Sequence, residues 1–368
     1  MNQTNAWGQG PGARGQGPAS SWQQAEGKGP AEPQARSEAS GEGRAIADPR
    51  PLTPDPCPSL PVDLSVALAG IRLQNPVLSA SGTFGYAQEF EGYFDLNRMG
   101  GIVVKTITRR PRPGNPPPRI VETPAGMLNA IGLQNVGIDA FIAEKLPYLR
   151  RLTPPLIVNV AGESVEDFRE LTKRIADQAG VAGIELNISC PNVAGGLDFS
   201  TDARLAYRVV KAAREATSLP VIPKLSPNVT DVAAIARAVA EAGADAISLI
   251  NTLVGMAIDV TTRRPKIANV TGGLSGPAIR PVAVRMVWQV ARAVRLPIIG
   301  MGGIVTAEDA AEFLLAGATA VAVGTANFLQ PGAAVQVIDG LERYCASQGV
   351  GRLRTLIGAV EIPPRARP

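Results

Sequence analysis

The segment around Cys190 carries the residue type best suited to proton transfer in this chain. Cys190 lies between Asn187 and Asn192, two side-chain amides that could hold a polar substrate around a thiol. A lone cysteine is more often inert packing, since free cysteine is among the most buried residue types. Its place at the end of an apolar run, between amides, favours the interpretation that Cys190 is a catalytic base.

Histidine is absent from the sequence, and this narrows the possible chemistry. The absence excludes Ser-His-Asp and Cys-His catalysis together with histidine metal sites. The three cysteines, Cys57, Cys190 and Cys345, form no CxxC pair. We therefore expect no metal site and no iron–sulfur cluster on this chain.

Two lysines, Lys105 and Lys224, end apolar runs and should point into a shared site. A buried lysine needs an anionic partner, or its pKa falls. The N1–C2=O edge of a reduced flavin is such a partner. A Schiff-base lysine of an aldolase-like enzyme is the competing role. The neighbouring asparagine amides favour hydrogen bonding to a flavin edge over imine chemistry.

Residues 127–135 form a second polar segment, which contains Asn129, Gly132 and Leu133. Asparagine offers both a donor and an acceptor, which matches the imide-like edge of a pyrimidine. Backbone N–H groups around Gly132 and Leu133 could hold a carboxylate. A polar turn between a strand and a helix would have the same composition, so this segment alone is ambiguous.

Two glycine-rich loops, residues 300–303 and 323–326, predict a phosphate site. Glycine lets backbone N–H groups approach an anion closely. Residues 272–276 would close the same wall of the pocket. Phosphate binding alone would also fit an aldolase or isomerase barrel.

Eight short apolar runs must position these residues, and they alternate with stretches of helical period. Unbroken apolar runs are typical of parallel strands covered by helices. Ser164 and Thr306 each precede an acidic residue three positions on, as at helix starts. The pattern predicts an α/β fold, a (β/α)8 TIM barrel; an open doubly wound sheet is weakened by the lack of a Gly-x-Gly-x-x-Gly motif. The runs are Val77–Ser81, Gly101–Thr106, Leu156–Val160, Gly183–Ile188, Val221–Leu225, Ala246–Ile250, Pro297–Gly300 and Ala320–Gly324.

Composition divides the chain into a tail and a barrel. Residues 1–60 are rich in Pro and Gly and predict a disordered N-terminal extension, while residues 61–368 form the predicted catalytic domain. The net charge of +4 gives no argument for nucleic acid. The sequence contains few cysteines, no apolar run long enough to span a bilayer and no apolar core of a secretory signal. These features predict a cytoplasmic protein without membrane attachment.

Taken in order, these pieces resemble the dihydroorotate dehydrogenase family from about residue 61 to 360. Each piece is weak alone, and together they are specific. The matching segments are residues 80–85, 104–106, 129–135, 187–192, 224–228, 250–252, 271–276, 300–303 and 323–326.

The resemblance implies a role for each matched residue. Cys190 takes the position of the catalytic base, while Lys105 and Asn187 touch both ligands. The implied contacts to flavin mononucleotide (FMN) are Ser81, Lys105, Thr106, Asn159, Asn187, Lys224, Ile250, Gly276, Gly302, Gly303, Gly324 and Thr325. The implied substrate contacts are Lys105, Asn129, Ala130, Ile131, Gly132, Leu133, Asn187, Asn192, Asn251 and Thr252.

The resemblance also implies a reaction and an assembly. Dihydroorotate would lose a proton from C5 and a hydride from C6 to flavin N5, giving orotate for pyrimidine (UMP) biosynthesis. Membrane-bound members carry serine as the base, so Cys190 indicates the soluble class. Ile131, Gln134 and residues 273–277 resemble the heteromeric NAD-linked type. In that type a homodimeric core binds a second subunit with FAD and a [2Fe–2S] cluster, giving a heterotetramer that passes electrons to NAD.

Several alternatives remain open on the sequence. A dihydrouracil-oxidising flavoenzyme and a fumarate-linked soluble dihydroorotate dehydrogenase would share the fold and cofactor. A dihydrouridine-synthase-like, RNA-modifying barrel should carry a further RNA-binding domain, for which we expect no room after the barrel. A catalytically silent flavin-binding protein is the remaining possibility, and adding dihydroorotate without oxygen would distinguish it.

Overall fold

The computed structural model describes residues 61–188 and 199–363. The predicted extension at residues 1–60, together with Cys190 and Asn192, lies outside these described residues. The division of the chain into extension and barrel domain therefore remains a prediction. In the part of the chain that is described, no helix is both long and apolar enough to cross a membrane.

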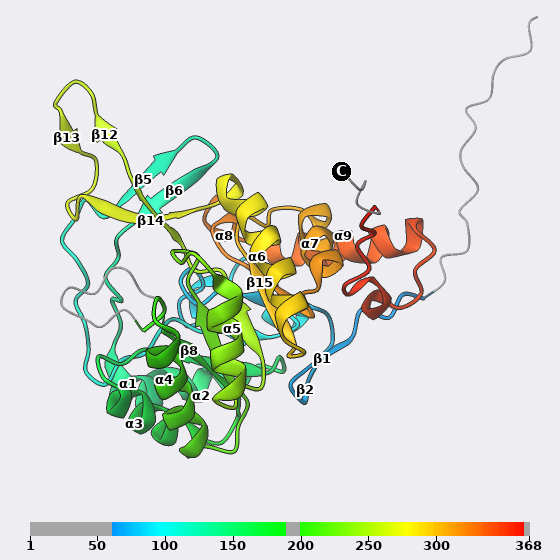
Figure 1. The fold of residues 1–368 in the computed structure, drawn as a ribbon, viewed down its shortest axis with the longest axis horizontal. Coiled ribbons are helices and arrows are strands. Elements are labelled where there is room, and N and C mark those ends of the chain that lie inside the picture. Colours follow the sequence, from blue (N-terminus) through cyan, green and yellow to red (C-terminus); the bar gives the residue numbers. More distant parts are fainter. Residues whose placement is uncertain (1–60, 189–198, 364–368) are drawn as a thin grey trace, which may run out of the picture. The chain divides into compact units, whose positions relative to one another are not determined.

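Eight parallel strands form the central sheet, in the order β3-β16-β15-β10-β9-β8-β7-β4 (Figure 1). The two end strands meet at a parallel bridge between Leu78 and Gly101, and the Ser79 hydroxyl donates to the Val103 carbonyl across this seam. The sheet thus curls into the predicted (β/α)8 barrel. Its strands are β3 (Val77–Ser79), β4 (Ile102–Val103), β7 (Leu156–Val160), β8 (Val181–Asn187), β9 (Val221–Leu225), β10 (Ile247–Leu249), β15 (Ile298–Met301) and β16 (Ala320–Val323).

Helices cover the outside of the barrel between successive strands. The Ser164 and Thr306 hydroxyls form capping boxes with Asp167 and Asp309, as the sequence predicted. Only two short 3-10 turns, Gln88–Phe90 and Leu96–Arg98, lie between β3 and β4, and the last helix packs against β3. The helices are α1 (Gly137–Ala140), α2 (Leu146–Leu149), α3 (Val165–Ala176), α4 (Ala203–Glu215), α5 (Val232–Glu241), α6 (Arg280–Ala293), α7 (Ala307–Ala316), α8 (Ala326–Leu329) and α9 (Ala333–Ser347).

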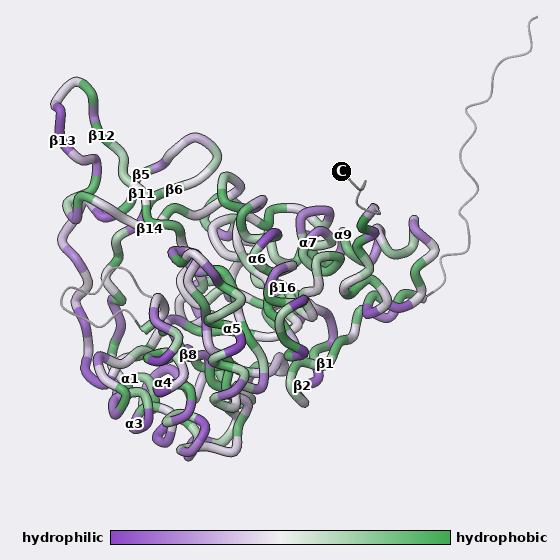
Figure 2. The backbone as a smooth tube through the Cα atoms, viewed as in Figure 1, coloured by the Kyte–Doolittle hydropathy of each residue, from purple (hydrophilic) through white to green (hydrophobic). Residues whose placement is uncertain are grey.

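The core is mainly aliphatic, with a few buried phenylalanines. Every residue of β7, β9, β15 and β16 is buried. Small residues admit larger side chains from the helices: a Cβ on Gly300 would lie 2.6 Å from the Phe313 ring of α7. Figure 2 shows hydrophilic residues on the outer helices around α3 and on the hairpin strand β13 (Arg264–Pro265).

A second, four-stranded sheet stands beside the barrel mouth, and the sequence reasoning missed it (Figure 1). All of its pairs are antiparallel, in the order β11-β14-β6-β5. These strands are β5 (Ile120–Thr123), β6 (Gly126–Asn129), β11 (Leu253–Met256) and β14 (Thr271–Ser275). The polar segment at residues 127–135 therefore begins in strand β6. Two hairpins complete the strands, β1 (Val66–Leu68) with β2 (Ile71–Leu73), and β12 (Ile258–Asp259) with β13.

Candidate active site

A cavity of about 590 Å³ lies at the carboxyl ends of the barrel strands, where this fold carries its active sites. Segments far apart in the sequence line it, and most of the expected site residues are among them. Those brought together are Ser81, Lys105, Thr106, Asn129, Ile131, Gly132, Leu133, Asn187, Lys224, Ile250, Asn251, Thr252, Gly276, Gly302, Gly303, Gly324 and Thr325.

Two expected contacts, Asn159 and Ala130, are buried but do not line this cavity. Asn159 is fully buried on β7 and donates through Nδ2 to the carboxylate of Glu185. The Ala130 carbonyl accepts a hydrogen bond from Asn115. The structure thus places these two side chains behind the cavity wall, and the ligand contacts assigned to them stay predictions.

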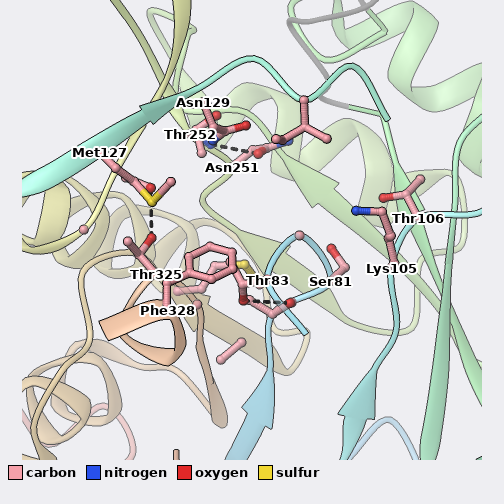
Figure 3. A pocket seen from close by; sticks show the side chains of 18 of the residues that line it. Ser81, Thr83, Lys105, Thr106, Met127, Asn129, Asn251, Thr252, Thr325 and Phe328 are labelled. Atoms are coloured by element: carbon pink, nitrogen blue, oxygen red, sulfur yellow. Dashed lines mark hydrogen bonds between the residues drawn. The ribbon is translucent and has the colours of Figure 1, made fainter. Parts of the chain in front are cut away.

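The two lysines occupy different parts of the cavity. Lys224 projects from β9, is 6% exposed, and its Nζ lies 3.5 Å from the Ser81 hydroxyl oxygen. Lys105 follows β4 and points into the cavity beside Thr106 (Figure 3). Burial lowers the pKa of Lys105, an effect that the nearby Glu89 carboxylate opposes. Both cations therefore stand where an anionic ligand would offset the cost of desolvation.

The backbone at Gly132 and Leu133 makes an unusual turn at the cavity. Both residues have a positive φ, 76° and 55°, so the chain makes a left-handed turn over two consecutive residues. A non-glycine residue in this region is uncommon and often marks a functional site. Among the described residues neither N–H group donates a hydrogen bond. The carboxylate contact expected at these two N–H groups stays a prediction.

A polar cluster of Asn129, Asn251 and Thr252 forms the neighbouring wall (Figure 3). The second sheet assembles it, because Asn129 Nδ2 donates to the Gly273 carbonyl of β14 at 3.3 Å. A Cβ on Gly273 would lie 2.0 Å from the Thr252 hydroxyl, so only glycine admits this approach. The cluster presents amides and a hydroxyl to one region of the cavity.

A cradle of glycines closes the opposite end of the cavity. Gly302, Gly303 and Gly276 have φ values of 131°, 79° and 95°, which favour glycine. A Cβ on Gly303 would lie 2.7 Å from the Gly276 carbonyl oxygen. The Thr325 hydroxyl donates to the Ser275 hydroxyl at 2.8 Å beside them. The glycines thus leave the backbone accessible to a ligand, and a side chain at these positions would displace that ligand.

These features fit FMN. The glycine cradle and Thr325 would hold its phosphate, and Lys224 and Lys105 would lie along the flavin ring. The cavity is also large enough for a ligand of this size, since ligand pockets span about 300–1,000 Å³.

Comparison with known proteins agrees with this geometry. Residues 63–345 match the family model described as dihydroorotate dehydrogenase. The chain belongs to the dihydroorotate dehydrogenase family. A protein from Geotalea uraniireducens, named dihydroorotate dehydrogenase B (NAD(+)), catalytic subunit, is 61% identical over 81% of this chain and 98% of its own. A protein of the same name from Geobacter sulfurreducens is 60% identical over 82% and 99%.

A solved dihydroorotate dehydrogenase supports the barrel fold. The crystal structure of the Eimeria tenella enzyme in complex with ferulenol superposes with a TM-score of 0.68. It covers 81% of this chain and 88% of the other at 24% identity. At that identity the likeness bears on the fold alone.

The dihydroorotate dehydrogenase cavity also contains residues that the sequence did not single out. Glu89 and Arg119 line it, and the Arg119 guanidinium donates to the side chain of Gln134, which the sequence analysis named only as a marker of the NAD-linked type. Tyr93 and Phe328 add exposed rings to its lining. Arg119 immediately precedes β5, and only the pairing of β5 with β6 brings it to the site. No local signal in the sequence distinguishes such an arginine from a surface charge.

The glycine cradle makes a testable prediction. Gly303→Ala should weaken FMN binding by roughly 10- to 100-fold, since a strained backbone position costs about 1–3 kcal/mol. Gly332→Ala is the matched control, because nothing lies within 4 Å of a Cβ there. Flavin content after dialysis and fluorescence titration of the apoprotein measure the effect. Equal retention of FMN by both variants would contradict the assigned phosphate site.

Proposed function

We propose that this chain is the catalytic subunit of an NAD-linked dihydroorotate dehydrogenase, which oxidises dihydroorotate to orotate in pyrimidine biosynthesis. The observation that carries the proposal is one cavity that joins a glycine cradle, the buried Lys224, the half-buried Lys105, the left-handed turn at Gly132 and Leu133 and an amide cluster. The names of relatives about 60% identical to the chain agree with it.

The cavity offers a separate set of groups to each part of the ligands. The FMN phosphate would lie on the backbone of Gly302, Gly303, Gly324 and Thr325. The dihydroorotate carboxylate would be held by the N–H groups of Gly132 and Leu133, with the Lys105 ammonium nearby. The imide edge of the substrate would meet the amide cluster. A ring fixed at both ends is oriented for reaction, which is a major source of rate enhancement.

Cys190 is the proposed catalytic base. Its thiolate would remove the C5 proton of dihydroorotate from one side of the ring. Bound FMN supplies the hydride acceptor on the other side. Asn187, the last residue of β8, donates to the Thr106 hydroxyl at 3.3 Å, and this contact would hold its amide beside the reacting ring. Proton transfer by a positioned group of this kind contributes about 10²–10⁴-fold.

A partner subunit would carry the electrons onward. We expect it to hold FAD and a [2Fe–2S] cluster, because this chain's three cysteines form no cluster motif. Tyr93 and Phe328, 66% and 55% exposed, lie on the cavity rim where such a subunit would reach the flavin edge. A homodimeric core with one partner per barrel gives the proposed heterotetramer, and we place the reaction in the cytoplasm.

Electron transfer to NAD tests the proposal. The chain is produced with and without the FAD and iron–sulfur subunit, and NADH formation is followed after dihydroorotate is added. We expect the isolated chain to reduce its own flavin but to form NADH only with the partner. Dihydrouracil, which lacks the carboxylate, serves as the control substrate. Faster flavin reduction by dihydrouracil, or reoxidation by fumarate rather than through the partner, would assign a different enzyme.

The pH dependence of flavin reduction should have two limbs. Reduction should rise with pH as Cys190 ionises, since a free thiol has a pKa of about 8.5. Burial lowers the pKa of Lys105, so this lysine loses its positive charge at a lower pH than a free lysine does. The affinity for dihydroorotate should therefore fall on the alkaline side. Stopped-flow reduction between about pH 6 and 10 measures both limbs, and a flat profile would contradict the thiol base.

A further inference from the structure

A carboxylate that the proposed mechanism does not use lies inside the barrel. Glu185 on β8 is 1% exposed. Its Oε1 accepts a hydrogen bond from the Ser248 hydroxyl at 2.7 Å, and its Oε2 accepts one from Asn159 Nδ2. Both oxygens thus act as acceptors, as those of an ionised carboxylate do. Three strands, β7, β8 and β10, are joined through this one side chain.

The Glu185 carboxylate is held by neutral hydrogen-bond donors in the described part of the chain. Among the described residues it forms no salt bridge with any lysine or arginine. Burying a charge in this way is costly, and apolar residues of similar volume often stabilise a fold as well or better. The carboxylate therefore has no evident purpose in stability, which points to a role in the adjacent site.

The position of Glu185 relates it directly to the cavity. Strand alternation turns Glu185 and Asn187 to the same face, and Asn187 lines the cavity. Ser248, its hydrogen-bond partner, is also the ladder partner of Lys224 on β9. The buried carboxylate of Glu185 and the buried side chain of Lys224, which lines the cavity, therefore lie on the neighbouring strands β8 and β9.

We propose that Glu185 is a positioning residue that sets the reduction potential of the bound flavin. The inference rests on the proposed function, because it requires FMN in the cavity. Two-electron reduction puts negative charge on the N1–C2=O edge of a flavin. Lys224 favours that charge and Glu185 disfavours it. In a poorly solvated interior both effects extend over several ångströms.

The opposing charges have a functional consequence. Without Glu185, no negative charge at this position would oppose the stabilisation of the reduced flavin by Lys224. The negative charge of Glu185 lowers the potential and makes the reduced flavin a better donor. The same carboxylate fixes the Asn159 amide, since an ionised carboxylate accepts hydrogen bonds only from the NH2 side of that amide.

The test compares midpoint potentials of FMN-loaded protein, by anaerobic titration against reference dyes. Glu185→Gln removes the charge and keeps the shape, so its potential should be higher than wild type. We expect roughly a tenfold change in the reduction equilibrium constant, which is about 30 mV for a two-electron couple. A unit charge about 10 Å away at an effective dielectric constant of about 20 gives this magnitude. Ser248→Ala is the control, because it removes a hydrogen bond to Glu185 and leaves the charge.

Each outcome decides between explanations. The proposal is supported if the midpoint potential rises in Glu185→Gln and the reduction equilibrium constant changes less than about twofold in Ser248→Ala. Equal potentials in Glu185→Gln and wild type, both loaded with FMN, overturn it and leave the proposed function intact. Glu185→Met provides a second variant should the glutamine protein fail to fold. If neither variant folds, Glu185 is a structural residue and the proposal is wrong. A wild-type protein that binds no FMN contradicts the proposed function instead.

Discussion

Cys190→Ala protein is expected to keep its bound flavin and to reduce it roughly 10²–10⁴ times more slowly with dihydroorotate. The alanine removes the proposed base and leaves the glycine cradle, the lysines and the amide cluster unchanged. Binding and orientation of the substrate therefore persist while the C5 proton has no acceptor. Single-turnover stopped-flow spectroscopy without oxygen measures the loss directly.

The chain offers a matched control for this experiment. Cys345 lies on α9, is fully buried, and burial raises the pKa of its thiol. Such a thiol is inert packing, so Cys345→Ala should keep the wild-type rate of flavin reduction. Near-normal reduction in Cys190→Ala would remove Cys190 from the mechanism. A comparable loss in Cys345→Ala would show that the effect arises from general damage to the fold.

Lys105→Met should cause the second large loss, in kcat/KM for dihydroorotate. Removing one member of a buried ionic contact costs about 2–5 kcal/mol, or roughly 30- to 3,000-fold. Methionine keeps most of the length of the side chain and removes only the charge that faces the carboxylate. The alkaline limb of the pH profile should vanish with it, because burial lowers the pKa of this lysine.

A surface lysine provides the control that distinguishes the loss of any positive charge from the loss of the charge in the cavity. Lys211 pairs with Glu215 on α4 at 50% exposure, so Lys211→Met should leave kcat/KM within about twofold. Orotate affinity, measured by flavin spectral titration, should fall in Lys105→Met in parallel with kcat/KM. Unchanged orotate binding in that variant would place the substrate carboxylate elsewhere in the cavity.

The barrel was predictable because its signal is local. Each strand is a short apolar run, and the two capping boxes, at Ser164 and Thr306, mark where the helices that follow begin. The polar residues after each run could then be assigned to one mouth, where the cavity lies. Parallel strands that are buried on both faces leave this pattern in any single sequence.

The second sheet was missed because its pairing is not local. Asn129 of β6 lies opposite Gly273 of β14, far along the chain, and β5 alternates between exposed and half-buried residues. The pairing of such short strands depends on contacts between segments far apart in the sequence, which no local pattern encodes. Arg119 and the exact environment of Thr252 follow from that pairing. Asn159 stays open: the family resemblance implies a flavin contact, while in the structure its side chain does not line the cavity and donates to Glu185.

The most direct test of the central claim is to add dihydroorotate to the purified chain without oxygen and to follow the visible absorbance of its flavin. The account predicts a yellow protein that bleaches on addition of dihydroorotate alone, before any partner subunit or NAD is supplied. A protein that takes up no FMN, or one whose flavin stays oxidised with dihydroorotate present, would contradict it.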